Sequence, residues 1–208
     1  MTNRWYKRLL FGIVTGLIGV GVFLTPYGQK LEEKFGLYWL FHLRGAIAAP
    51  DEVVVIAIDQ PSATHFNLPL LPRLWPRDMH AQLIDLLTAA GARIIVFDLI
   101  FDSPSTVPEH DKKLAHAMRV AGNTVLIERL TYRNAELIVD ENREHAMIRQ
   151  EGAMQLLPEI ANTARASAPF PLPKAERVND YWVFKTSAGD FPTVPAVVLQ
   201  LYALPLHN

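Results

Sequence analysis

Residues 50–105 read PDEVVVIAIDQPSATHFNLPLLPRLWPRDMHAQLIDLLTAAGARIIVFDLIFDSPS and decide the fold. Val53–Ile58 is a continuous apolar run rich in β-branched residues, which is typical of a strand buried on both faces of a parallel sheet. A helix is predicted from about Asp78 to Ala90, because apolar residues recur there at helical spacing and Gly91 follows. Arg93–Asp98 is predicted as the second strand. This strand, helix, strand order favours an α/β fold with a mainly parallel sheet core.

The pattern continues downstream and then weakens. A helix over 109–121 and a strand over 124–128 complete a second α/β unit, in which right-handed crossover connections are expected. The stretch from Arg129 to Glu151 is charged and is interpreted as a solvated segment. Further predicted elements are a helix over 154–166, a proline-rich loop over 168–173, a strand over 181–186 and a helix over 194–203.

An apolar segment precedes the α/β region. Leu9–Gly28 carries no formal charge, and 20 helical residues rise about 30 Å, enough to cross a bilayer core. Basic residues precede it without an acid among them, so the N-terminus is predicted to be cytoplasmic and everything after Gly28 extracytoplasmic. A cleaved signal peptide is the rival interpretation, but no clear small-residue cleavage site follows the apolar run. The basic residues are Arg4, Lys7 and Arg8.

This reading divides the chain into three parts. Residues 1–28 form the cytoplasmic tail and membrane anchor, 29–49 a juxtamembrane helix, and 50–208 the α/β domain. The lipid bilayer is therefore a predicted partner. Gly12 and Gly16 have the GxxxG spacing that allows close helix pairing, so a homodimer through this face is one hypothesis, although glycine is common in membrane helices.

Composition excludes several classes of function. The chain has 208 residues, a net charge of −1 and no cysteine. Disulfides, thiol nucleophiles and cysteine metal sites are therefore excluded. No basic stripe with interleaved aromatic residues is present, so no nucleic-acid partner is expected.

Three segments resemble the CHASE2 domain family. They are RGAIAAPDEVVVIAID (residues 44–59), WPRDMHAQLIDLLTAAGARIIVFDLIFDSPS (residues 75–105) and DKKLAHAMRVAGNTVLI (residues 111–127). The resemblance weakens but stays in order through FPTVPAVVLQLYAL (residues 191–204). It implies a bacterial extracytoplasmic sensory domain behind an inner-membrane anchor, without catalysis or a cofactor of its own. The ligand, a small molecule or a protein, is left unidentified by the resemblance.

The resemblance also implies parts that this sequence does not contain. Family members carry further membrane helices and a cytoplasmic output such as a nucleotide cyclase or a protein kinase. The later sheet elements of the family should follow the helix over 194–203. The α/β domain is therefore expected to be incomplete at its C-terminus, with the output in a further segment or on another chain.

Five polar residues near the predicted strand ends are candidates for ligand binding or for anchoring loops. Asp59, Asp98 and Asp102 lie at or beyond strand carboxyl ends, where ligands bind in open α/β sheets. Together with His80 they could hold a divalent cation, and the chain would then be an exported metal-dependent hydrolase. The favoured alternative has these acids cap turns, with Arg77 pairing with one of them. A third hypothesis is a membrane-tethered scaffold that pairs through Gly12 and Gly16.

Overall fold

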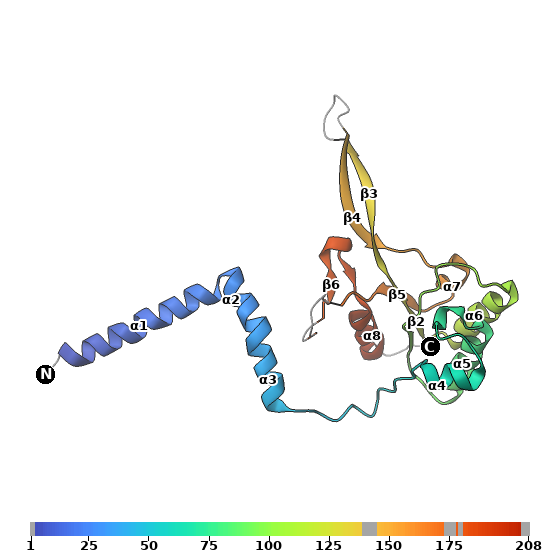
Figure 1. Cartoon of the computed structure of the whole chain (residues 1–208), viewed down its shortest axis with the longest axis horizontal. Coiled ribbons are helices and arrows are strands. Elements are labelled where there is room, and N and C mark those ends of the chain that lie inside the picture. Colours follow the sequence, from blue (N-terminus) through green and yellow to red (C-terminus); the bar gives the residue numbers. More distant parts are fainter. Residues whose placement is uncertain (1–2, 139–144, 173–177, 179–180, 205–208) are drawn as a thin grey trace. The chain divides into compact units, whose positions relative to one another are not determined.

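The computed structural model describes residues 3–138, 145–172, 178 and 181–204. The chain divides into two compact units, residues 1–55 with 176–179 and residues 56–175 with 180–208. The helices of the first unit lie within residues 3–44, and the second unit contains the sheets (Figure 1).

The first unit contains the apolar helix. Its elements are α1 (Asn3–Phe23), α2 (Pro26–Leu31), the π-helix η1 (Glu32–Gly36) and α3 (Leu37–Arg44). Among the described residues, one helix is long and apolar enough to cross a membrane, Arg4–Phe23, with a mean hydropathy of 1.5. The prediction that this helix continues to Gly28 is wrong, because α1 ends before Pro26. Proline has no N–H to donate and disfavours helical geometry in the residue before it.

The second unit combines parallel and antiparallel strands with short helices. Its elements are α4 (Gln60–Phe66), the 3-10 helix η2 (Pro72–Leu74), α5 (Arg77–Ala89), β1 (Ile95–Phe97), α6 (Pro108–Ala121), β2 (Thr124–Glu128), β3 (Leu130–Ile138), β4 (His145–Ala153), α7 (Pro158–Ala161), β5 (Ala166–Pro169), β6 (Phe184–Lys185), the 3-10 helix η3 (Thr186–Ala188), β7 (Phe191–Pro192) and α8 (Val194–Ala203).

The central sheet has three parallel strands in the order β1-β2-β5. Val96 pairs with Val125, and Ile127 pairs with Ala168, so β2 is the middle strand. The side chains of Thr124, Val125 and Leu126 are completely buried, as expected of a strand covered on both faces. The predicted α/β class with a parallel core is confirmed.

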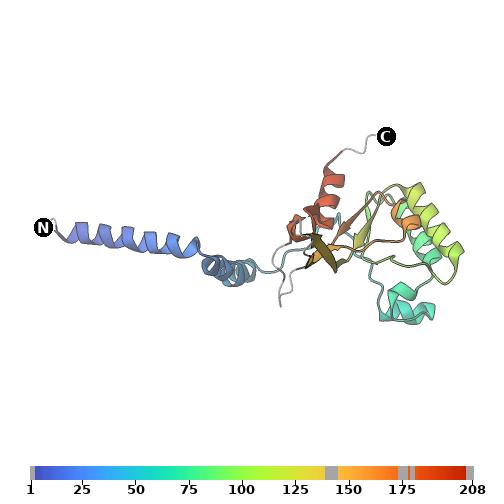
Figure 2. The ribbon, with the colours of Figure 1, turned by 90° about the horizontal axis from the view of Figure 1, so that it is seen from above.

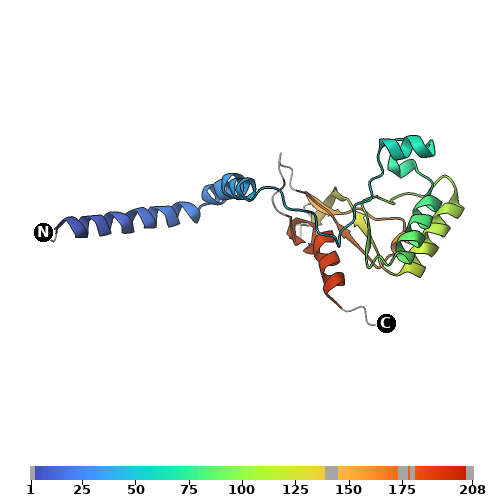
Figure 3. The same cartoon turned by 90° about the horizontal axis from the view of Figure 1, so that it is seen from below.

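Helices cover both faces of this sheet. Ile84 of α5, Leu114 of α6 and Ile160 of α7 are fully buried in one core, which also contains Leu126. The next residue along β2, Ile127, points to the opposite face. There it packs with Val194 of α8 (Figures 2 and 3). The result is a three-layer arrangement in which α5, α6 and α7 form one outer layer and α8 the other.

A long antiparallel hairpin leaves this core. Strands β3 and β4 pair from Leu130 with Ala153 to Ile138 with His145, and the hairpin extends away from the central sheet (Figure 1). The charged stretch 129–151, interpreted as a solvated face, contains these two strands, which its local pattern did not predict. Its polar composition hides the strands, because a two-stranded ribbon that extends from the core needs no continuous apolar face.

Three further predictions need correction. Residues 53–59 have no regular secondary structure, and Val53, Val54 and Val55 are 62%, 80% and 86% exposed. β-propensity describes how side chains fit a pleated surface and cannot supply the partner strand that pairing requires. The helix predicted over 154–166 shrinks to α7, and the loop predicted over 168–173 begins inside β5. Pairing with β2 overrides the local preference there.

Candidate functional site

The loop that follows β1 is held by a buried ion pair. Arg77, at the start of α5, and Asp111, in the first turn of α6, are 7% and 2% exposed. Arg77 Nη1 donates to Asp111 Oδ1 over 2.5 Å, and Arg77 Nη2 donates to the carbonyl oxygen of Ser103. The second oxygen of Asp111 accepts from the backbone N–H of Ser105. Two helix starts and the loop between β1 and α6 are therefore joined at one point.

The charge of Asp111 is stabilised by these contacts. Burial alone would raise the pKa of the Asp111 carboxyl. The N–H of Ser105 and the guanidinium of Arg77 outweigh burial and hold that pKa below its ordinary value. Asp111 is consequently ionised at neutral pH, as a charged hydrogen bond to a buried arginine requires.

His80 lies beside this pair in an aromatic environment. It is 3% exposed, and its ring centre lies 6.0 Å from that of Phe97 and 6.1 Å from that of Phe101. The Arg77 guanidinium also lies against this cluster, 5.2 Å from the centre of the Phe101 ring. Burial, and secondarily the charge of Arg77, lower the pKa of His80 to about 4. His80 is therefore neutral at physiological pH.

The three candidate aspartates do not converge. Asp59 begins α4 as its N-cap and accepts hydrogen bonds from the backbone N–H of Ser62, at 2.9 Å, and from its hydroxyl. These bonds lower the pKa of Asp59. Asp102 accepts from the hydroxyl of Ser103, and Asp98 is exposed just beyond β1.

Two of the five candidates, Arg77 and His80, lie against the ring of Phe101. The expectation that Arg77 pairs with a strand-end acid is wrong, since its partner is Asp111 on α6. Asp111 lies in the acidic first turn of α6, and this position did not by itself identify Arg77 as its partner. In the described part of the chain, no group of three potential metal ligands forms, so the hydrolase hypothesis gains no support.

The arrangement is that of an anchored loop rather than an open reaction centre. Phe101 is 4% exposed, and its carbonyl oxygen accepts from the backbone N–H of Leu157. The loop after β1 is thus tied to α5, α6 and the segment before α7. Such a connection can transmit a change at one helix to its neighbours, because packed elements move as units.

Comparison with known proteins yields one family. The sequence model of the CHASE2 domain matches residues 13–204, which is nearly the whole chain. No curated protein and no solved structure matches the chain.

Proposed function

The chain belongs to the CHASE2 family of extracytoplasmic sensory domains, and we propose that it is a membrane-anchored input domain of a bacterial transmembrane signalling system. The observation that carries this proposal is the family match itself, which begins at residue 13 and so includes most of the apolar part of α1. The proposed domain senses and does not catalyse. Its output enzyme lies in a further segment or on another chain.

The properties of α1 support an anchor in the inner membrane. Its side chains are exposed along the whole candidate span, which distinguishes it from the core helix of a globular domain. Trp5 and Tyr27, near the two ends of this segment, are 70% and 80% exposed, and such rings favour the membrane interface. The basic residues at its start place the N-terminus in the cytoplasm by the positive-inside tendency.

This topology is testable because the chain has no cysteine of its own. We expect Asp51→Cys in the full chain to react with a membrane-impermeant maleimide on intact spheroplasts, because residue 51 is proposed to be extracytoplasmic. Asn3→Cys, in the matched variant, should react only after the membrane is permeabilised. Labelling of Asn3→Cys but not of Asp51→Cys on intact spheroplasts would show the opposite orientation and contradict the proposal.

The sensing role rests on differential binding. A ligand shifts a protein between two packings only by the difference in its affinity for them. The anchored loop after β1 offers a connection that such a shift would move, because Arg77 and Asp111 tie it to two helices.

We expect at least one compound in a panel of amino acids, dicarboxylates, sugars and short peptides to raise the melting temperature of the full chain in detergent. At roughly 100 times its Kd, a ligand specific for the native state stabilises by about 2.7 kcal/mol. Thermal unfolding followed by tryptophan fluorescence measures the shift. A folded sample that responds to no compound in the panel would contradict direct sensing of these classes.

A further inference from the structure

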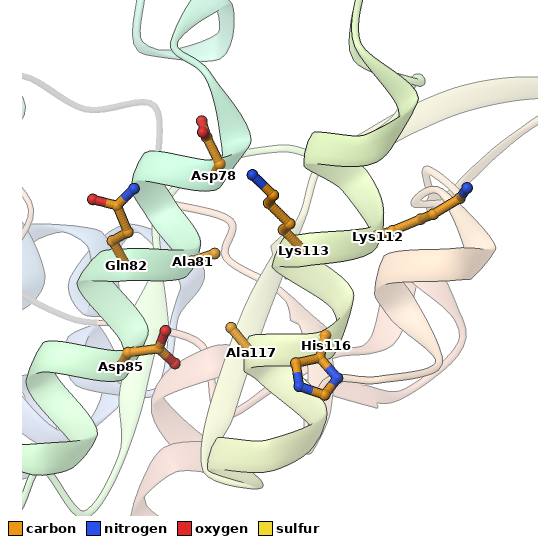
Figure 4. Close-up of a pocket in the computed structure, with 8 residues that line it drawn as sticks. All are labelled: Asp78, Ala81, Gln82, Asp85, Lys112, Lys113, His116 and Ala117. Atoms are coloured by element: carbon orange, nitrogen blue, oxygen red, sulfur yellow. The ribbon is translucent and has the colours of Figure 1, made fainter.

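We propose that the outer face of the α5–α6 pair is a contact surface for a second copy of this chain. A groove of about 450 Å³ runs between the two helices. Its floor consists of Ala81 and Ala117, which point toward each other between the helices (Figure 4). Because these two side chains are small, the longer polar side chains of α5 and α6 extend on either side of them and form the two walls of the groove.

The two walls carry opposite charge. The wall from α5 contains the acids Asp78 and Asp85, two turns apart, whereas the wall from α6 contains the base Lys113. Asp78 has a partner within the domain, since its Oδ1 lies 3.7 Å from Nδ1 of His110. Asp85 and Lys113 have no ion-pair partner in the part of the chain that the structure describes. Each is therefore available to a charge on another molecule.

A two-fold axis along the groove makes this face complementary to itself. The residue numbers on α5 and α6 run in the same direction (Figure 4). Rotation about an axis parallel to the helices therefore lays α5 of one copy on α6 of the other and keeps equivalent positions level. Lys113 of each copy then faces the acidic row from Asp78 to Asp85 of its neighbour. An axis across the helices would instead place acid against acid, which is unfavourable.

Apolar side chains accompany the charges. Leu86 and Val120 are 68% and 69% exposed, and they follow the groove-lining residues Gln82 and His116 by one helical turn on the same helix faces. Exposed apolar side chains of this size are normal when scattered, but these two lie on the helix pair that carries the opposed charges. Association of two copies would remove both side chains from water.

The face is small, which predicts weak association. Helices of 13 and 14 residues are about 20 Å long, and a pair is about 20 Å wide, so each copy offers roughly 400 Å². That is about half of what one partner contributes to a standard interface of ~800 Å² per side. The contact itself does not depend on the proposed sensing role. The proposed anchor adds effective concentration, because it confines both copies to one membrane.

The first test changes the charges in the full chain, with Förster transfer between labelled copies in liposomes as the readout. Lys113→Glu should weaken association about tenfold, because it places like charges opposite each other twice per dimer. Adding Asp85→Lys in the same chain should restore association, because the opposed signs are then exchanged. Arg73→Glu, an exposed reversal on η2, is the control of equal charge change and should have no effect. Failure of the double variant to recover would overturn the proposed pairing.

The second test reads the geometry by disulfide formation on the cysteine-free background. Gln82→Cys lies on α5 and His116→Cys on α6, so a mixture of the two variants should form a mixed disulfide under mild oxidation. Each variant alone should crosslink at least about fivefold less, because the proposed axis keeps equivalent helices diagonal to one another. Equal crosslinking by a single variant, or none in the mixture, would exclude this arrangement. The outcome of these two tests has no bearing on the proposed membrane topology, which the maleimide experiment tests separately.

Discussion

Asp111→Ala is expected to lower the free energy of unfolding by about 3–5 kcal/mol, the usual cost of removing one partner from a buried ion pair. The side chain is 2% exposed and accepts from both Arg77 and the N–H of Ser105. Its removal leaves a guanidinium that is 7% exposed without a counter-charge and an N–H without an acceptor. Urea unfolding of the full chain in detergent, followed by tryptophan fluorescence, measures the loss.

The matched control is another acid of the same helix turn. Glu109 pairs with Lys112 over 2.7 Å, but both side chains are more than 60% exposed. Solvent screens such a pair, so Glu109→Gln should not measurably change the unfolding free energy. Equal effects of Glu109→Gln and Asp111→Ala would show that the buried pair contributes no more than a surface pair.

A double variant separates the charge from the hydrogen bonds. Arg77→Met with Asp111→Leu removes both charges and fills part of their volume, which is often far less destabilising than removing one. Recovery should be incomplete here, because the carbonyl of Ser103 and the N–H of Ser105 lose their partners as well. The remaining difference from the unsubstituted chain estimates what anchoring the loop contributes.

Local sequence patterns predicted the elements whose own residues form a clear apolar pattern. The strand over 124–128 and the helix over 194–203 have the predicted bounds, because an uninterrupted apolar run and a helical stripe are visible without knowing the partner. Val53–Ile58 shows the limit of this reasoning. Its composition is that of a buried strand, but a strand forms only where another strand accepts its hydrogen bonds.

The buried ion pair could not be predicted from local sequence patterns. Arg77 and Asp111 are 34 residues apart, and nothing in the local pattern around either residue specifies the other. Asp59 and Asp102 were expected to cap turns, and both make contacts with neighbours within three residues, as turn-forming acids do. His80 was predicted only as a possible ligand beside the aspartates. Its burial against Phe97 and Phe101 follows only from the packing of α5 on the loop after β1.

Burial of His80 also makes stability depend on pH. In the folded chain the pKa of His80 is lowered to about 4, whereas the ordinary value is 6.5. As pH falls from 6.5 to 4, His80 binds a proton in the unfolded chain but stays neutral in the folded chain. The unfolding free energy therefore decreases over this range. At 1.36 kcal/mol for each pKa unit, the total loss is about 3 kcal/mol. The lowered pKa of Asp111 acts in a separate window, because its contribution is lost only as pH falls below about 3.8.

We therefore expect His80→Phe to flatten the dependence of unfolding free energy on pH between 6.5 and 4. Phenylalanine keeps the ring contacts with Phe97 and Phe101 but cannot bind a proton. A change in packing would shift the unfolding free energy equally at every pH, whereas loss of the titrating imidazole would change the slope. His65→Gln, at an exposed histidine of α4, is the control and should retain the slope of the unsubstituted chain. Urea titrations at half-unit pH steps provide the curves. A slope that survives in His80→Phe would assign the pH dependence to another group and contradict the burial of a neutral imidazole as its cause.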